Sequence, residues 1–311
     1  MILAAGLTPA WQQIMLFERF VPGEVNRARQ VAWCASGKVL NVGIALHHLG
    51  AESQTLALTG GSCGQAIQRE FARLGVPYRF VTSAASTRIC TTILDQATSQ
   101  TTELVENAAA VRADEIEAFQ AAYAHAAARA SLVVLTGSLP AGTPATLYRD
   151  LLRQTLVPAI LDVRGEELLL ALEQSPFLIK PNREELERTI GRPIATDAEL
   201  VAAMQELNRR GATWVVVTQG KHAVWATNGD RVYRAEAPAV QVVNPIACGD
   251  CLAAGLAWGI EQGLPVIEAL RLGIAAAGEN ARQLLPARLD AESVRLRAAA
   301  IDVESFWSAT A

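Results

Sequence analysis

Short apolar runs alternate with longer amphipathic stretches along most of the second half of the chain. The apolar runs have the length of strands and lie at residues 132–135, 159–161, 177–179 and 214–217. The amphipathic stretches are rich in Ala, Leu, Glu and Arg, which favour helices. They include residues 113–129, 144–154, 197–210 and 265–285. Because βαβ units around a parallel sheet give this alternation, the pattern predicts a doubly wound α/β core.

Residues 11–33 and 87–106 do not follow this rhythm, because β-prone residues alternate there with polar ones, as at Ile89, Thr91 and Ile93. Such segments form either edge strands of the main sheet or a small separate sheet that covers a ligand cleft. We predict the separate sheet, with these two segments as a lid. The sequence shows no internal repeat and no low-complexity linker, so we expect one domain over residues 1–311.

The charge balance argues against large anionic partners. The 311 residues include 27 basic and 31 acidic side chains, with a net charge of −4 and a pI of about 5.7. This balance gives no general attraction to nucleic acid or to an anionic membrane, so neither is expected as a partner. Any phosphate must therefore be bound by a local site. The hydrophobic content of 51% is ample for a buried core.

The N-terminal segment and the cysteines favour a cytoplasmic location. Residues 1–7 contain no basic residue and lead directly into Thr8 and Pro9, so we expect a first buried strand and not a signal peptide. No apolar run reaches the ~18 residues of a spanning helix. The five cysteines are an odd number spread over a long chain, which fits reduced thiols better than a disulfide framework.

The segment 244–255 is the strongest candidate for chemistry. A strand-like run at 240–243 gives way there to Ala247, Cys248 and Gly249, which are small enough to let the backbone approach a ligand. Asp250 then falls in the first turn of a predicted helix, where backbone N–H groups favour a phosphate. A carboxylate at this place can accept a hydroxyl proton. An ordinary helix start, with Asp250 suited to the helix dipole, explains the same residues.

Three further segments follow predicted strands or open predicted helices. Gly37, Lys38 and Asn41 precede a predicted helix at 43–49 and offer backbone room, a point charge and an amide to a sugar or phosphate, although a simple helix cap is an alternative. Residues 59–64 open a helix but lack the spacing of a dinucleotide fingerprint. Residues 136–142, which include Ser138, follow a buried strand at the sheet edge where α/β enzymes build sites.

Asn182 and Glu185 also lie at a strand-to-helix junction. Three positions apart on a helix, they could orient water around Mg²⁺, which keeps several waters and takes few protein ligands. The alternative is a capping box, in which Asn182 caps the helix and Glu185 reaches back. Both interpretations can hold for the same residues.

Other chemistries receive little support from the sequence. Cys248 and Cys251 have the spacing of a dithiol motif, and a helix N-terminus lowers a thiol pKa. A redox site, however, would not explain the other segments. The four histidines lack ligand spacing, so no zinc is expected. The Walker A spacing and the Gly-x-Ser-x-Gly elbow are both absent from the sequence.

Taken together and in this order, these segments resemble the ribokinase-like (pfkB) carbohydrate kinase family, and within it the branch of 1-phosphofructokinases and tagatose-6-phosphate kinases. The resemblance extends from about residue 7 to residue 280, nearly the whole chain. The matching segments are residues 23–28, 37–42, 87–89, 137–140, 177–185 and 244–250.

The resemblance implies a mostly parallel central sheet flanked by helices, with a small β-sheet lid that often forms a homodimer. It implies ATP-dependent phosphorylation of a sugar hydroxyl, with ATP and Mg²⁺. It also implies site residues. Asp250 would be the base, with the amides of Ala247, Cys248 and Gly249 as the anion hole. The implied sugar-phosphate contacts are Gln12, Arg27, Gly37, Lys38, Asn41, Arg88 and Ser138. The implied nucleotide contacts are Lys180, Asn182, Thr218, Gly220 and Asn280. Glu185 and Asn182 would hold Mg²⁺ through water.

This chain departs from the family pattern at three places. Gln12 stands where the branch has an acid that contacts sugar hydroxyls, and Val39 stands where glycine is usual. Ala247 begins the anion hole in place of glycine. Because alanine does not easily adopt a positive φ, we expect a turn that differs slightly from that of the family.

The sequence therefore predicts a kinase that phosphorylates a ketohexose phosphate, such as fructose 1-phosphate, fructose 6-phosphate or tagatose 6-phosphate, to a bisphosphate. Two alternatives stay open. One is a kinase of an unphosphorylated sugar or a nucleoside-like acceptor, which Gln12 and Trp11 would favour. The other is a sensor of sugar or nucleotide without catalysis, against which the presence of Asp250, Gly249 and Glu185 argues.

Overall fold

The computed structural model describes residues 1–307 and contains a large sheet of ten strands within that range. Seven neighbouring strands of this sheet are parallel, and the three at one edge are antiparallel. In spatial order the strands are β14 (Val303–Trp307), β13 (Arg231–Ala235), β12 (Val224–Thr227), β11 (Trp214–Val217), β10 (Leu178–Ile179), β9 (Ala159–Asp162), β8 (Leu132–Thr136), β1 (Ile2–Gly6), β4 (Ser53–Thr59) and β5 (Tyr78–Thr82). The mostly parallel α/β core is thus confirmed.

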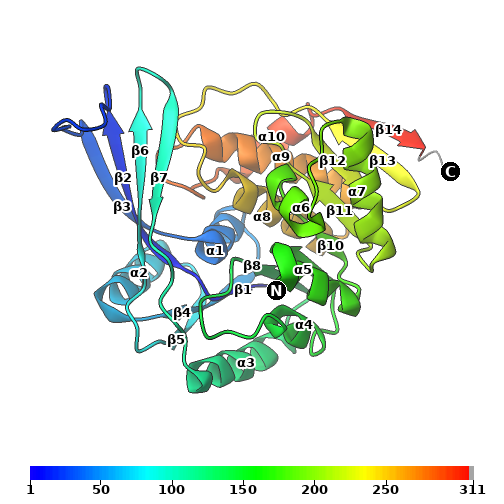
Figure 1. Ribbon diagram of the computed structural model, residues 1–311, viewed down its shortest axis with the longest axis horizontal. Coiled ribbons are helices and arrows are strands. Elements are labelled where there is room, and N and C mark those ends of the chain that lie inside the picture. Colours follow the sequence, from blue (N-terminus) through cyan, green and yellow to red (C-terminus); the bar gives the residue numbers. More distant parts are fainter. Residues whose placement is uncertain (308–311) are drawn as a thin grey trace.

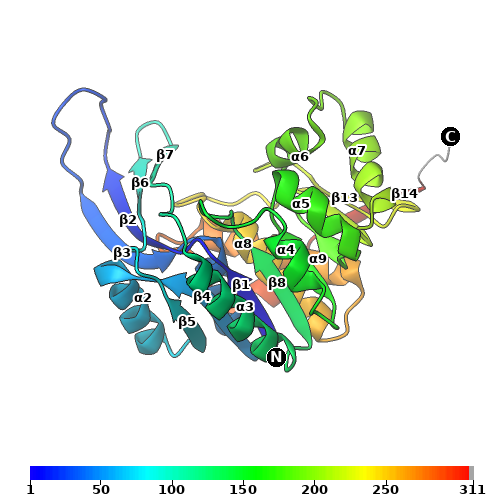
Figure 2. The ribbon, with the colours of Figure 1, turned by 60° about the horizontal axis from the view of Figure 1, so that its bottom comes forward.

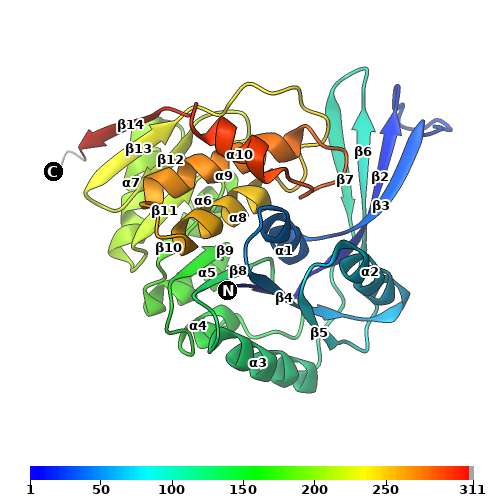
Figure 3. The same ribbon diagram turned by 180° about the vertical axis from the view of Figure 1, so that it is seen from behind.

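Helices cover both faces of the large sheet (Figures 1 and 3). One face carries α1 (Lys38–His48), α2 (Gly61–Leu74), α8 (Cys248–Glu261), α9 (Val266–Ala281) and α10 (Ala291–Ala298). The other carries α3 (Ala113–Ala127), α4 (Leu147–Leu152), α5 (Gly165–Ala171), the short 3₁₀ helix η1 (Leu172–Gln174), α6 (Arg183–Ile190) and α7 (Asp197–Arg209). Each face has its own hydrophobic core, because side chains alternate along a strand: Ile2 and Ala4 of β1 face one core, and Leu3 and Ala5 face the other.

A second sheet of four strands stands apart from the large one (Figure 2). Its strands, in spatial order, are β3 (Gln30–Ser36), β2 (Ala10–Phe17), β6 (Ile89–Asp95) and β7 (Gln100–Val105). The central pair is parallel and the outer pairs are antiparallel. The separate small sheet predicted from 11–33 and 87–106 is therefore confirmed, and we call it the small sheet below.

Two local predictions were wrong. The helix predicted at 43–49 begins earlier, at Lys38, because Gly37 adopts a φ of 88° and turns the chain directly into α1. Lys38 and Asn41 therefore lie in the first turn of the helix. Residues 240–243 do not form a strand. Val242 and Val243 are 58% and 40% exposed, so their β-prone character is not used to build a sheet.

No helix within residues 1–307 is both long enough and apolar enough to cross a membrane.

Candidate active site

A cleft lies between the small sheet and the carboxyl ends of the parallel strands, where open α/β sheets bind ligands. Its volume is about 450 Å³. The large sheet contributes Asp162 at the end of β9, Lys180 just after β10 and Thr218 just after β11. The opposite wall is formed by residues of the small sheet, and the first turns of α1 and α8 close the cleft between them.

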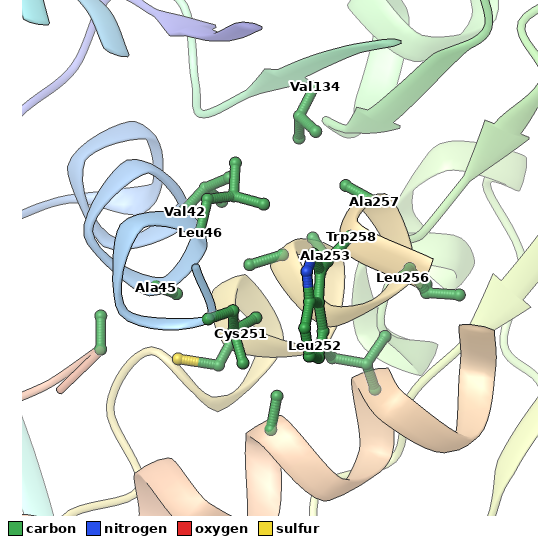
Figure 4. Packing of buried hydrophobic residues seen from close by; sticks show 14 of the residues in the cluster. Val42, Ala45, Leu46, Val134, Cys251, Leu252, Ala253, Leu256, Ala257 and Trp258 are labelled. Carbon is green, nitrogen blue, oxygen red and sulfur yellow. The ribbon is translucent and has the colours of Figure 1, made fainter. Parts of the chain in front are cut away.

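Asp250 is held by a rigidly packed helix. It occupies the first turn of α8, which is buried along most of its length. Figure 4 shows Cys251, Leu252 and Leu256 of this helix in the same hydrophobic cluster as Val42 and Leu46 of α1. Because close-packed cores resist displacement, the carboxylate has a fixed position at the cleft.

The environment of Asp250 favours a proton acceptor. Its Oδ2 accepts a hydrogen bond of 2.7 Å from Asn41 Nδ2, and the residue is only 6% exposed. Burial, together with the nearby carboxylate of Asp162, raises the pKa of Asp250 to about 6, although Lys38 and the Asn41 hydrogen bond oppose the rise. The carboxylate is therefore ionised at neutral pH yet more basic than an ordinary aspartate.

The turn before α8 is strained and firmly tied. Ala247 adopts φ 67° and ψ 8°, a left-handed conformation that alanine does not easily adopt. Two asparagines hold the turn around Ile246: Asn244 Oδ1 accepts from the Ile246 N–H at 3.0 Å, and Asn280 Nδ2 donates to the Ile246 carbonyl at 2.7 Å. These bonds compensate for the left-handed alanine. The Cys248 N–H donates to the Pro245 carbonyl at 3.4 Å. The N–H groups of Gly249 and Asp250 have no partner inside the helix, so they are available to a ligand.

Asp162 joins the two lysines of the cleft. Its Oδ1 lies 3.0 Å from Lys38 Nζ and its Oδ2 lies 3.2 Å from Lys180 Nζ. Burial alone would raise the pKa of Asp162, but the two ammonium groups outweigh it and hold that pKa below its usual range. Lys38 also lies 3.3 Å from Glu185 Oε1. Burial favours a lower pKa for Lys38, and the surrounding carboxylates raise it above its usual range instead. Lys38 thus remains charged.

Lys180 lies against the turn that precedes Asp250. A Cβ atom added to Gly249 would be 3.5 Å from Lys180 Nζ. Lys180 is 3% exposed and is paired with Asp162. A group bound at the start of α8 therefore meets both the helix N–H groups and this ammonium.

Asn182 and Glu185 form the predicted capping box. Asn182 Oδ1 accepts from the Glu185 N–H at 2.8 Å, and Glu185 Oε2 accepts from the Asn182 N–H at 3.0 Å. Both residues line the cleft, as do Thr218 and Gly220 at the same end. Among residues 1–307, no group of three or more His, Cys, Asp or Glu side chains could hold a metal ion by itself. The arrangement fits a hydrated Mg²⁺ that is held through water.

The small sheet presents polar groups to the other end of the cleft. Gln12 Nε2 donates a hydrogen bond of 2.7 Å to Thr92 Oγ1, and both side chains are buried. The Arg88 guanidinium donates to the carbonyls of Thr8, Pro9 and Glu106, at 3.2, 3.4 and 3.1 Å respectively. These contacts fix its plane at the edge of the cleft.

The remaining predicted residues occupy other places. Gly37 lines the cleft at the start of α1. Arg27 lies in the exposed loop between β2 and β3. Ser138 is exposed after β8, where its carbonyl accepts from Thr8 Oγ1 at 3.2 Å. Asn280 is fully buried under the turn before α8. The last three do not line the cleft, and their ligand contacts stay predictions.

Two acidic residues of the cleft were missed by the sequence analysis. Asp162 ends a buried strand, and a carboxylate at that place is a signal that could have found it. Glu103 lies on β7, and the alternation of side chains along 101–105 was the only signal for its facing the cleft.

The cysteines at the start of α8 are protonated thiols. Burial raises the pKa of Cys248 to about 11, and burial also raises the pKa of Cys251 well above its usual range. Cys248 Sγ accepts from Asn280 Nδ2 at 3.4 Å. Because the thiolate is the reactive form, neither side chain is suited to nucleophilic chemistry at neutral pH.

Comparison with known proteins identifies the family. The solved structure of a Thermotoga maritima protein described as a "possible 1-phosphofructokinase" has a TM-score of 0.90 at 21% identity, with 98% of this chain and 99% of that chain covered. Phosphofructokinase-2 of Escherichia coli in complex with potassium has a TM-score of 0.88 at 22% identity, with 96% and 98% covered. These structures show a shared fold. A family model described as pfkB family carbohydrate kinase matches residues 7–288. The chain therefore belongs to the pfkB family of carbohydrate kinases and is an ATP-dependent sugar kinase.

Proposed function

We propose that this kinase transfers the γ-phosphoryl group of ATP to a primary hydroxyl of a ketohexose phosphate, giving a bisphosphate. The observation that carries the proposal is Asp250, a buried carboxylate with a raised pKa at a helix N-terminus, bonded to Asn41 and facing a cleft with two charged lysines. A base, an anion-binding helix start and fixed cations are the parts that phosphoryl transfer requires.

In this proposal the acceptor hydroxyl lies beside Asp250. The hydroxyl oxygen forms a bond to the γ-phosphorus, the bond from that phosphorus to the ADP oxygen breaks, and the hydroxyl proton passes to Asp250. The Gly249 N–H and the Lys180 ammonium stabilise the charge on the moving phosphoryl group, a role supported by the position of Lys180 against Gly249. Asn41 holds the accepting oxygen in place.

We place the nucleotide at the end of the cleft that contains Asn182, Thr218 and Gly220. Mg²⁺ bound there would balance the charge of the phosphate groups. Glu185 supports a water-mediated position, because one of its oxygens accepts from the Asn182 N–H and the other lies near Lys38. A metal that prefers to keep its waters fits such a site.

The acceptor end supports a phosphorylated sugar through Arg88. A guanidinium has five N–H donors, and three N–H contacts to backbone carbonyls leave two donors in a fixed plane at the cleft edge. Planar, fixed guanidinium groups suit phosphate oxygens. The small sheet would act as a lid that excludes water from the reacting groups.

An unphosphorylated acceptor is the second candidate. Lys38 is already paired with Asp162 and Glu185, so its charge is not free for a second phosphate. Glu103 also lines the acceptor end and would oppose an anion near Arg88. These charges favour a sugar without phosphate.

Release of ADP from Mg·ATP distinguishes the two candidates. The panel consists of fructose 1-phosphate, fructose 6-phosphate, tagatose 6-phosphate, and free fructose and tagatose. A single phosphorylated acceptor that loses affinity in Arg88→Gln supports the first candidate. Turnover of free sugars alone, unaffected by that substitution, supports the second. No turnover of any sugar contradicts both.

The role of Asp250 is tested by Asp250→Asn. We expect kcat to fall by about 10²–10⁴-fold, while the KM values change little, because the asparagine keeps the shape of the site and an oxygen for Asn41. Asp197→Asn is the matched control, since Asp197 lies in the first turn of α7 and is exposed. Near-normal turnover by Asp250→Asn contradicts the role.

We also propose that two copies associate through the outer face of the small sheet. Trp33 and Val31 of β3 are 43% and 48% exposed on this face, and Leu104 of β7 is 56% exposed. Trp11 stacks on Trp33 with 6.1 Å between ring centroids. Exposed aromatic and aliphatic groups gathered in this way are typical of interfaces.

Light scattering should give a dimer for the wild type and for Leu156→Ser, a control at a distant site whose side chain is 98% exposed. It should give a monomer for Trp33→Ser; a wild type that is monomeric contradicts the proposal.

A further inference from the structure

One face of the small sheet faces the cleft, and its strand register identifies the side chains on that face. Gln12 of β2 pairs with Cys90 of β6, Cys90 pairs with Val105 of β7, and Thr92 pairs with Glu103. Paired residues share a face, and side chains two apart on a strand do so as well. Gln12, Cys90, Glu103 and Val105 all line the cleft. The amide, the hydroxyl and the carboxylate of Gln12, Thr92 and Glu103 therefore form a polar row across three strands.

The hydrogen bonding within this row leaves acceptor atoms toward the cleft. Gln12 Nε2 gives one of its two N–H groups to Thr92 Oγ1. The carbonyl oxygen of that amide remains as a hydrogen-bond acceptor. Glu103 adds a carboxylate, which when ionised is only an acceptor. A ligand that brings hydrogen-bond donors therefore finds acceptors along this row.

Glu103 carries a carboxylate at the acceptor end of the cleft that is less neutralised by salt bridges than the other carboxylates there. The carboxylates of Asp162 and Glu185 are already paired with lysines, whereas Glu103 forms no salt bridge with any other residue between 1 and 307. Although it lies at the open side of the cleft, loss of part of its hydration raises the pKa of its carboxylate, and Arg88 opposes that rise. Its charge is therefore available to a ligand.

Sugar hydroxyls are the donors that this row suits. Two carboxylate oxygens can accept from two neighbouring hydroxyls, and such charge-assisted bonds are about twice as strong as neutral ones. We propose that Glu103 is a specificity-determining residue of the acceptor site. Together with Gln12, it distinguishes sugars by the configuration of their hydroxyl groups. This inference rests on the proposed kinase function and adds to it the group that distinguishes one sugar from another.

The test compares two sugars that differ at one hydroxyl. Fructose and tagatose are epimers, and they are used as 1-phosphates, 6-phosphates or free sugars, whichever form the wild type phosphorylates. The quantity measured is the ratio of the two kcat/KM values, in the wild type and in Glu103→Gln. We expect the ratio to move toward unity by about tenfold, because the loss of a charged hydrogen bond removes discrimination of that size. The change should lie in the KM of the sugar, with the KM of Mg·ATP unaltered.

Two controls separate the outcomes. Glu18→Gln changes an exposed acid beside β2 that does not line the cleft, and it should keep the wild-type ratio. An unchanged ratio in Glu103→Gln, or an equal loss for both epimers, overturns the inference and leaves the kinase function intact. A wild type that phosphorylates none of these sugars in any of the three forms overturns the proposed function itself, and the inference with it.

Discussion

Replacement of Asp250 by asparagine is expected to stabilise the fold at neutral pH while it removes activity. Burial of the carboxylate, reinforced by Asp162, raises the pKa of Asp250 from its ordinary 3.8 to about 6. At about 1.36 kcal/mol per pKa unit, the ionised carboxylate costs the folded state about 3 kcal/mol. An asparagine carries no charge, and it can still accept the hydrogen bond from Asn41. The variant therefore avoids this cost.

The free energy of unfolding that Asp250→Asn gains over the wild type depends on pH. Asp250 ionises near pH 3.8 in the unfolded chain and near pH 6 in the folded protein. Between these values the unfolded state binds fewer protons than the folded state, so the wild-type free energy of unfolding falls as pH rises. The fall ends above the folded pKa. Relative to the wild type, Asp250→Asn should gain little near pH 4 and about 3 kcal/mol above pH 6.

Urea unfolding, followed by tryptophan fluorescence, measures this difference. Both proteins are unfolded at several values between about pH 4.5 and about pH 7.5, and their free energies are compared at each pH. Asp197→Asn serves again as the control and should show no pH-dependent gain, because its side chain is exposed. A difference between Asp250→Asn and the wild type that stays constant over this range, or that decreases as pH rises, refutes the reasoning.

Four other predictions concern the same site and its supports. The kcat/KM of the wild type should rise with pH and level off above about pH 6, because the base must be ionised; a flat rate profile contradicts this. Asp162→Asn should lower the free energy of unfolding by about 3–5 kcal/mol, since it leaves Lys180 buried without its counter-charge, and an unaltered urea midpoint counts against the pairing. Ala247→Gly should raise the thermal midpoint slightly or leave it unchanged, because relief of a left-handed alanine, about 1 kcal/mol, offsets the added freedom of the unfolded chain; a marked drop is inconsistent with strain. Gly255→Ala should lower both stability, by about 1–3 kcal/mol, and kcat, because its Cβ would lie 2.7 Å from the backbone of α9, and wild-type kinetics would show that α8 tolerates the shift.

The sequence predicts those parts of the fold that depend on local pattern. Alternation of apolar runs with amphipathic stretches predicts the strands β8, β9, β10 and β11 and the helices between them, and period-two alternation predicts the small sheet. The antiparallel strands β12, β13 and β14 were not predicted. The capping box formed by Asn182 and Glu185 also depends only on local sequence, because these residues lie three positions apart at a helix start. The start of α1 was missed because Gly37 offers no side chain as a cap, so only its positive φ marks the boundary.

The parts that could not be predicted depend on contacts between distant segments. The role of Asp162 depends on its ion pair with Lys38, which lies 124 positions away in the sequence. The role of Glu103 depends on the register of β6 and β7 and on which face of the small sheet meets the cleft. Conversely, Arg27 has the right chemistry for a phosphate, but it lies in an exposed loop. Residue type alone does not distinguish these cases.

The shared carboxylate of Asp162 has a consequence for the order in which activity appears as the chain folds. Lys38 and Lys180 reach it from opposite sides along the sequence, and both lie on segments made before α8. During synthesis the cluster of charges can therefore form before Asp250 leaves the ribosome. Such a nascent chain could not transfer a phosphoryl group, because its proton acceptor on α8 is added later.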